Sequence, residues 1–190
     1  MTKISRYQIK VPSDVHVIYC EKSKILAVIG PLKTASFKST LKILLHKHKK
    51  VITVSSQSLF QISKATKKKI KTLQNSTIAK IKHLIIESSS TIAQKLKIVG
   101  VGYRLDVSNI KNESWLMLKL GYSHPIFAKA PKDISFNSFT KTNINIIGKS
   151  YEEVTHFSAN IRQKKTPDPY KGKGILYENE QPVLKEGKKV

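Results

Sequence analysis

The sequence predicts an α+β protein built from two similar small domains, each an antiparallel-rich sheet packed with a helix. Three observations predict it: short alternating segments typical of strands, two segments with helical periodicity, and the same order of elements in both halves. With 190 residues, of which 39% are hydrophobic, the chain can bury two cores. We expect domains at 1–88 and 89–176, followed by a basic tail at 177–190.

In the first half, strand patterns are followed by a helical pattern. Alternating or β-branched segments at 15–19, 25–29 and 51–54 predict strands. Helical spacing then runs from about Ser58 to Ile86, with no glycine or proline to interrupt it. The apolar residues expected on the buried face of this helix are Ile62, Ala65, Ile70, Leu73, Ile81 and Leu84.

The second half repeats this order. Strands are predicted at 96–99, 103–107, 115–120 and 143–147, with a turn at 108–114. Gly30 and Gly121, which end corresponding pairs of strands, lie 91 positions apart. We therefore predict two units of similar topology.

A helix is expected after the last of these strands. Ser150 is a typical N-cap residue, and Glu153, three positions later, completes a capping box. Pro167 prevents the helix from continuing. The expected apolar stripe consists of Val154, Phe157 and Ile161.

The charge of the chain indicates a polyanionic partner. Lys and Arg number 35 against 12 Asp and Glu, a formal net charge of +23. Such repulsion destabilises a compact protein unless a polyanion screens it, and nucleic acid is the obvious one. Most of the cations are lysines, which bind phosphate as point charges and do not read base edges in the bidentate manner of arginine. No window approaches the ~18–20 apolar residues of a membrane-spanning helix, so no membrane partner is predicted.

Motifs for catalysis, metals and cofactors are missing from the sequence pattern. Cys20 is the single cysteine, which excludes an intramolecular disulfide and a cysteine metal cage. The segment 100–104 lacks the third glycine of a dinucleotide loop, because Leu105 stands there. The segment 148–150 resembles the end of a P-loop, but Asn143 replaces its first glycine. The sequence therefore predicts a protein that is not an enzyme, with no metal or cofactor.

The segment from Thr166 to Tyr177 carries the strongest functional signal. Its prolines prevent a helix, its glycines allow close approach of the backbone, and its lysines and tyrosines can contact phosphates, sugars and bases. We predict a rigid cationic loop that fits an RNA backbone. The predicted RNA-binding residues are Arg162, Lys164, Lys165, Pro167, Pro169, Tyr170, Lys171, Gly172, Lys173 and Gly174.

Other basic clusters lie at 47–50, 67–71 and 185–189. Lys67, Lys68 and Lys69 are consecutive on a predicted helix, so they point in different directions and cannot all serve one contact. We rank this cluster below the one at 162–173. The polar tail is expected to be disordered until it meets its partner.

Three motifs, in this order, carry a resemblance to a known family. They are Leu96-Lys-Ile-Val-Gly-Val-Gly-Tyr-Arg104, Leu118-Lys-Leu-Gly-Tyr-Ser-His-Pro125 and Pro167-Asp-Pro-Tyr-Lys-Gly-Lys-Gly174. Together they resemble the protein six family of the large ribosomal subunit, in its bacterial or organellar form. The match is strong over 95–177 and weaker over the first half. Leu176 departs from the family, which usually has an arginine there.

The resemblance implies two similar α+β domains and a structural role on large-subunit ribosomal RNA. Members bind near the sarcin–ricin loop, beside neighbouring ribosomal proteins and the site of translational GTPase factors. The matching RNA-contact positions are Lys164, Lys165, Tyr170, Lys171, Gly172, Lys173 and Gly174.

The location and two other function classes stay open at this point. The divergent first half and the lysine bias favour a mitochondrial ribosome, with a bacterial cytoplasm or a plastid as alternatives. The other function classes are an RNA-processing or RNA-modifying enzyme, and a non-ribosomal basic protein that binds nucleic acid or a membrane surface. The sequence contains no nucleophile, metal or cofactor motif that would favour the enzyme.

Overall fold

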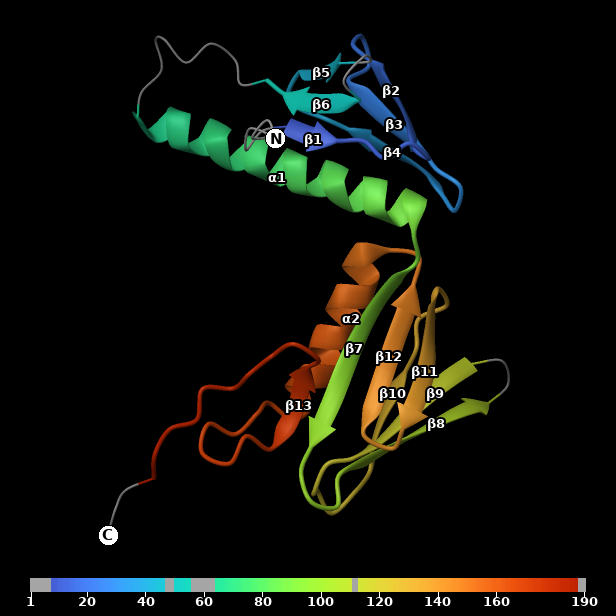
Figure 1. The fold of residues 1–190 in the computed structure, drawn as a ribbon, viewed down its shortest axis with the longest axis vertical. Coiled ribbons are helices and arrows are strands. Elements are labelled where there is room, and N and C mark those ends of the chain that lie inside the picture. Colours follow the sequence, from blue (N-terminus) through green and yellow to red (C-terminus); the bar gives the residue numbers. More distant parts are fainter. Residues whose placement is uncertain (1–7, 47–49, 56–63, 111–112, 188–190) are drawn as a thin grey trace. The chain divides into compact units, whose positions relative to one another are not determined.

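The computed structural model describes residues 8–46, 50–55, 64–110 and 113–187. It divides the chain into two compact units, which we call unit 1 (Met1–Ser90) and unit 2 (Thr91–Val190). In each unit, antiparallel sheets pack with a helix (Figure 1). The predicted α+β class is therefore confirmed.

Unit 1 consists of two three-stranded sheets and one helix within its described residues. The elements are β1 (Gln8–Lys10), β2 (His16–Cys20), β3 (Ile25–Ile29), β4 (Thr34–Lys38), β5 (Ile43–His46), β6 (Val51–Val54) and α1 (Lys64–Ser89). The strand orders are β1-β6-β5 and β2-β3-β4, and α1 packs against β3, β4 and β6. The sequence predicted β2, β3 and β6 to within one residue; it missed β1, β4 and β5.

The buried face of helix α1 overlaps only in part with the one that the apolar pattern predicted: Ile81 is buried and Leu84 packs against the core, as expected. Ala65 and Leu73 are exposed, although both were expected to be buried. The buried row comprises Gln74, Thr77, Ile78, Ile81, Ile85, Glu87 and Ser88. Gln74 is tolerated there because its side-chain amide donates a hydrogen bond to the Val54 carbonyl (2.7 Å). Hydrophobic periodicity cannot detect a buried polar residue of this kind. The first part of the predicted helix, residues 58–63 with Ile62, lies outside the described residues.

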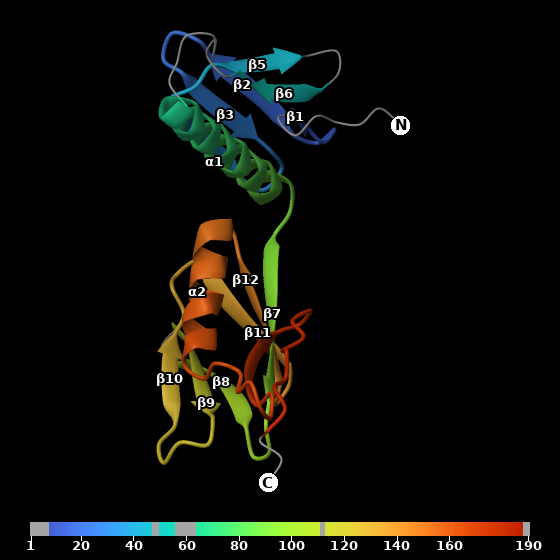
Figure 2. The ribbon, with the colours of Figure 1, turned by 90° about the vertical axis from the view of Figure 1, so that its left-hand side faces the viewer.

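Unit 2 contains two sheets, a shorter helix and a final strand. The elements are β7 (Ile92–Val99), β8 (Arg104–Ile110), β9 (Glu113–Lys119), β10 (Ile126–Lys129), β11 (Ile134–Thr140), β12 (Asn143–Gly148), α2 (Tyr151–Gln163) and β13 (Gly174–Tyr177). The strand orders are β11-β12-β7-β13 and β10-β9-β8, and α2 packs against β7, β12 and β13 (Figure 2). The predicted turn at 108–114 is shorter than expected, because β8 and β9 extend into it.

The two units share one topology. The order β1-β6-β5 in unit 1 corresponds to β7-β12-β11 in unit 2, and β2-β3-β4 corresponds to β10-β9-β8 read in reverse. In both units the helix follows the sixth strand. Strand β13 is the addition: it pairs with the free edge of β7. The prediction of a loop over 166–177 is therefore wrong for its last four residues, which form β13. Three of these residues, Gly174, Ile175 and Leu176, are buried.

Helix α2 begins where its sequence predicts, but without the predicted capping bond. Ser150 occupies the N-cap position in an extended conformation, yet its hydroxyl makes no capping hydrogen bond. Its carbonyl instead accepts the Val154 N–H (3.1 Å). Val154 and Ile161 are buried as expected, so the apolar stripe orients the helix.

Candidate nucleic-acid interface

The segment between α2 and β13, residues 164–173, forms a turn organised by one carboxylate. We call it the α2–β13 loop. Asp168 accepts the backbone N–H groups of Tyr170 (3.1 Å) and Lys171 (3.3 Å) through its two side-chain oxygens. Its own backbone N–H donates to the Lys173 carbonyl (2.9 Å), and its carbonyl accepts the Gly172 N–H (2.8 Å). Four hydrogen bonds thus hold Tyr170 and Lys171 in place.

Gly172 in the loop and Gly174, the first residue of β13, are required by the backbone conformation and by a contact within the chain. Gly172 has φ +66°, a left-handed conformation that side chains rarely adopt. A Cβ on Gly174 would lie 2.7 Å from the Pro167 Cα. Both glycines are buried. The sequence suggested that these glycines let the backbone come close to another surface. For Gly174 that surface is within the chain, because the start of β13 lies against Pro167.

Two lysines and the aromatic ring of the loop are exposed, and its other two lysines are half-buried. Lys164, Pro169, Tyr170 and Lys171 are exposed, with Tyr170 at 59%. Lys165, Pro167 and Lys173 are half-buried. The loop therefore presents ammonium groups and one flat ring on a stiff backbone, a combination that suits a sugar-phosphate surface.

A second aromatic segment completes this surface. The Lys165 ammonium lies over the Tyr122 ring, 4.3 Å from its centroid, and the Tyr122 hydroxyl donates to the Lys164 carbonyl (3.2 Å). Tyr122 follows Gly121, whose φ is +75° and where a Cβ would lie 2.9 Å from the Tyr103 ring. A polar hollow of about 430 Å³ forms here, lined by Tyr103, Tyr122, Gln163, Lys164, Lys165, Thr166, Asp168 and Lys173.

Sequence reasoning missed Tyr103, Tyr122 and Asp168 as parts of this site. Tyr103 and Tyr122 each follow a glycine, and both lie in the motifs that carry the family resemblance, 96–104 and 118–125. These motifs could have indicated them. Asp168 lies between two prolines, a position typical of a turn that a carboxylate stabilises.

Arg162 is engaged inside the chain. Its Nε donates to the Glu180 carboxylate (3.1 Å), and its Nη2 donates to the second oxygen of the same group. Glu180 also accepts the Tyr177 N–H (3.2 Å). The hydrogen bond from Arg162 lowers the pKa of Glu180 below its usual value. Arg162 thus fastens the segment after β13 to α2, and a direct RNA contact by Arg162 stays a prediction.

The described part of the tail lies against the rest of unit 2. The Glu178 N–H donates to the Lys95 carbonyl (3.3 Å), and the Lys185 N–H donates to the Pro169 carbonyl (2.8 Å). These bonds attach residues Glu178 and Lys185 to β7 and to the α2–β13 loop, and disorder of the tail before it meets its partner stays a prediction. Residues 188–190 lie outside the described residues.

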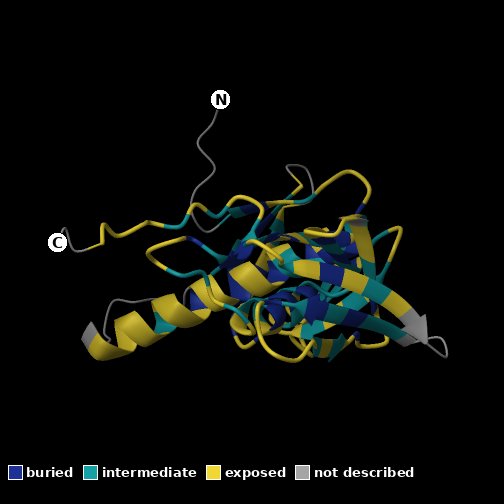
Figure 3. Cartoon of the chain, turned by 90° about the horizontal axis from the view of Figure 1, so that it is seen from below, coloured by how far each residue is buried: buried dark blue, intermediate teal, exposed yellow. Residues whose placement is uncertain are grey.

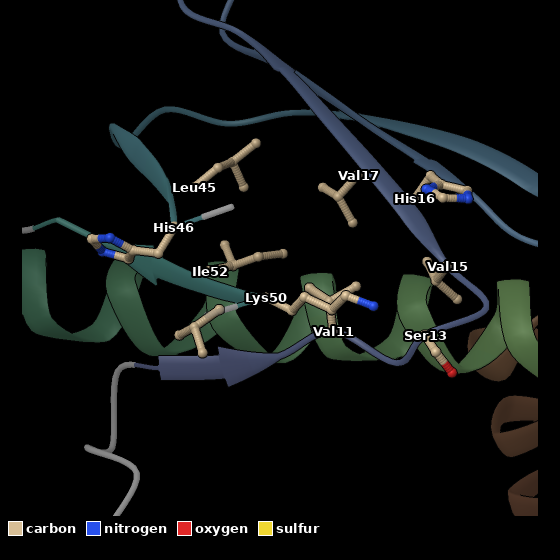
Figure 4. Close-up of a pocket in the computed structure, with 10 residues that line it drawn as sticks. Val11, Ser13, Val15, His16, Val17, Leu45, His46, Lys50 and Ile52 are labelled. Atoms are coloured by element: carbon tan, nitrogen blue, oxygen red, sulfur yellow. The ribbon is translucent and has the colours of Figure 1, made fainter. Parts of the chain in front are cut away.

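Unit 1 contains an apolar hollow of a different kind (Figure 4). It measures about 270 Å³ and is lined mainly by valine, leucine and isoleucine side chains of β2, β5, β6 and the segment between β1 and β2. Its two histidines, His16 and His46, lie on separate sides of the hollow (Figure 4), and His46 shares a hydrogen bond with the Thr53 hydroxyl (3.2 Å). The described residues that line this hollow include no aspartate or glutamate to form an acid–base pair with either histidine.

The described residues offer neither a metal site nor a membrane-spanning helix. They contain no group of three or more histidine, cysteine, aspartate or glutamate side chains placed to hold a metal ion. Within the same ranges, no helix is both long and apolar enough to cross a membrane.

Comparison with known proteins places the chain among ribosomal proteins. The family model for ribosomal protein L6 matches residues 99–178. The large ribosomal subunit protein uL6 of Malacoplasma penetrans is 36% identical, over 99% of this chain and 96% of that protein. The uL6 proteins of Nitrosococcus oceani (32% identical, 100% and 99% covered) and Mycoplasma genitalium (34% identical, 99% and 97% covered) match over similar lengths.

These relatives are bacterial, so they give the predicted mitochondrial location no support. The first half, which seemed divergent, aligns along its whole length with the same proteins. Identity above 30% over nearly the full length leaves one conclusion: the chain belongs to the ribosomal protein L6 family, whose members are structural and not catalytic components of the ribosome.

Proposed function

We propose that this chain is a structural constituent of the large subunit of a bacterial ribosome and binds large-subunit ribosomal RNA through unit 2. Its neighbours would be other large-subunit proteins, and its location the bacterial cytoplasm. The family resemblance supports a position near the sarcin–ricin loop, beside the site of translational GTPase factors.

The observation that carries the proposal is the constrained α2–β13 loop. Four hydrogen bonds around Asp168 hold Tyr170 and Lys171 at the surface, so little conformational entropy is lost when they meet a partner. Lys164, Lys165 and Lys173 add positive charge around the same hollow. Stiffness supplies fit, and the lysines supply affinity for phosphates.

The test is binding of the full chain to a ribosomal RNA fragment containing the sarcin–ricin region, measured over a range of salt concentrations. We expect Lys171→Ala with Lys173→Ala to lower affinity about tenfold or more, and to reduce the log–log salt slope by about 0.9 for each lost phosphate contact. The matched control is Lys132→Ala with Lys149→Ala, which removes two exposed lysines from unit 2 outside the loop. Equal effects of both pairs would contradict a contact through the loop.

A further inference from the structure

The net positive charge is larger in unit 1 than in unit 2, although the proposed RNA contact lies in unit 2. Residues 1–90 contain 18 lysines and arginines against 3 acidic residues, whereas residues 91–190 contain 17 against 9. The three acids of unit 1 already have partners: Asp14 accepts the Ser13 hydroxyl (2.8 Å), Glu21 pairs with Lys42 (3.6 Å), and Glu87 pairs with Lys33 (3.0 Å). Most cations of unit 1 therefore have no carboxylate to balance them.

Helix α1 carries the densest part of this charge. It contains seven lysines and one glutamate. Its buried residues begin at Gln74, and residues 65–73 are exposed apart from the half-buried Ile70 (Figure 3). The amino-terminal turns of α1 therefore extend past the apolar core and have little tertiary packing to support them.

Three of these lysines form a straight row. Lys68, Lys71 and Lys82 are related by spacings of three and eleven residues, which place them on one face of an α-helix together with Asn75. All four side chains are exposed. We call these residues the α1 row; at ~1.5 Å per residue it extends about 21 Å along the helix. Lys69 lies on another face of the helix, as expected for consecutive lysines. Lys68 and Lys71 nevertheless share one face with Lys82.

The charges of α1 oppose its helical conformation. Its first turn contains no acidic residue, so the lysines there face the positive end of the helix dipole without compensation. Lys68 and Lys71, three residues apart, are neighbours on the helix surface, as are Lys67 and Lys71, and like charges at these spacings repel. A polyanion along the row would remove both penalties.

The residues between the lysines favour RNA over a protein partner. On this face Thr72, Asn75 and Ala79 are small or able to form hydrogen bonds, and the row contains no large apolar side chain between Lys68 and Lys82. A protein interface needs an apolar centre, whereas a phosphate backbone needs lysines with polar residues between them.

We propose that the α1 row is a second RNA-binding surface, which lies along a phosphate ridge of a folded RNA and is separate from the α2–β13 loop. The inference rests on the proposed function for the identity of the ligand, ribosomal RNA. It does not rest on the loop, because the row belongs to the other unit.

The test compares two triple variants of the full chain in binding to large-subunit ribosomal RNA. We expect Lys68→Gln, Lys71→Gln and Lys82→Gln together to lower affinity at least tenfold, and to reduce the log–log salt slope by about two to three. The control is Lys22→Gln, Lys24→Gln and Lys38→Gln, which removes the same charge from exposed positions of unit 1 on or between β2, β3 and β4. We expect it to lower affinity less than threefold. Glutamine preserves helix propensity, and circular dichroism checks that α1 is retained.

A photocrosslinking side chain in place of Asn75 reports direct contact with RNA, which a general effect of charge on affinity would not produce. We expect it to crosslink to RNA in the bound complex, and the same group at Ser36, exposed on β4, to give no crosslink. Equal affinity losses in the two triple variants, or no crosslink from Asn75 to RNA in the bound complex, would overturn the proposal. If Lys171→Ala with Lys173→Ala abolishes binding while the triple variant of the α1 row binds normally, the α1 row is not an RNA-binding surface and the proposed function stands. If the unaltered chain does not bind ribosomal RNA, the proposed function itself fails.

Discussion

Unit 1 and unit 2 use the same six strands and helix, but they extend that framework in different places. In unit 2 the helix has 13 residues, and the chain continues into the α2–β13 loop and β13. In unit 1 the helix has 26 residues, and its amino-terminal turns lie beyond the core. The shared topology provides both cores, while α1 and the α2–β13 loop carry the lysines of the two proposed RNA-binding surfaces.

The two units also handle their charges differently. Unit 2 places carboxylates among its cations: Asp168 holds the loop, Glu180 pairs with Arg162, and Glu178 pairs with Lys95 (3.1 Å). Unit 1 leaves its lysines on α1 without carboxylate partners among the described residues. A site whose backbone is fixed by internal acids can present a defined shape, whereas an unbalanced helix depends on its partner for stability.

Replacing Gly174 should have the largest effect, and it should be confined to unit 2. In Gly174→Ala, the φ of +153° and the 2.7 Å approach of the new Cβ to Pro167 would force β13 or the loop to shift. We expect a loss of about 2–4 kcal/mol in the free energy of unfolding of unit 2, measured by denaturant titration with probes in each unit. Gly187→Ala is the control, because no atom lies within 4 Å of its Cβ position. Destabilisation of both units alike would break the comparison.

Replacing Asp168 separates shape from charge. Asp168→Ala removes a negative charge, which by electrostatics alone should strengthen RNA binding. We expect affinity to fall severalfold, because Tyr170 and Lys171 lose their backbone partners, and stability to fall by about 1–2 kcal/mol. Asp133→Ala removes the same charge from an exposed position outside the loop and should raise affinity slightly. Stronger binding by both variants would show that charge, and not the shape of the loop, governs binding.

Replacing Glu180 should have the smallest effect of the three and should depend on pH. The pKa of Glu180 is lowered by its hydrogen bond with Arg162, so its contribution to stability is present above the unfolded-state pKa of about 4.3. That contribution is lost as the pH falls through the lower pKa of the folded state. We expect Glu180→Gln to cost about 1 kcal/mol at neutral pH and less at pH 3. Thermal unfolding measures both effects, and Glu186→Gln, at an exposed position of the same segment, is the control variant.

Much of the fold could be predicted because its signals are local. Strands β3 and β6 match their predicted bounds, and α2 follows Ser150, since alternation and capping preferences act over a few residues. Strand β13 could not be predicted in this way. Its glycine and preceding prolines read as a loop, and it becomes a strand because β7 offers an unpaired edge.

The site was predicted in part for the same reason. Its lysines and Tyr170 lie in one short segment whose composition is unusual, so they stand out in the sequence. Tyr122, 43 positions before Lys165, joins them only because folding places its ring beneath that ammonium group (4.3 Å).

The α+β class, the repeated plan, the excess of positive charge and the segment that bears the loop were all predictable, because composition and short-range periodicity record these properties. The burial of one face of α1, the pairing of Arg162 with Glu180 and the grouping of lysines on one surface could be seen only in the folded chain. These outcomes depend on contacts between residues distant in the chain, where a hydrogen bond such as that of Gln74 to Val54 outweighs the preference of a side chain taken alone.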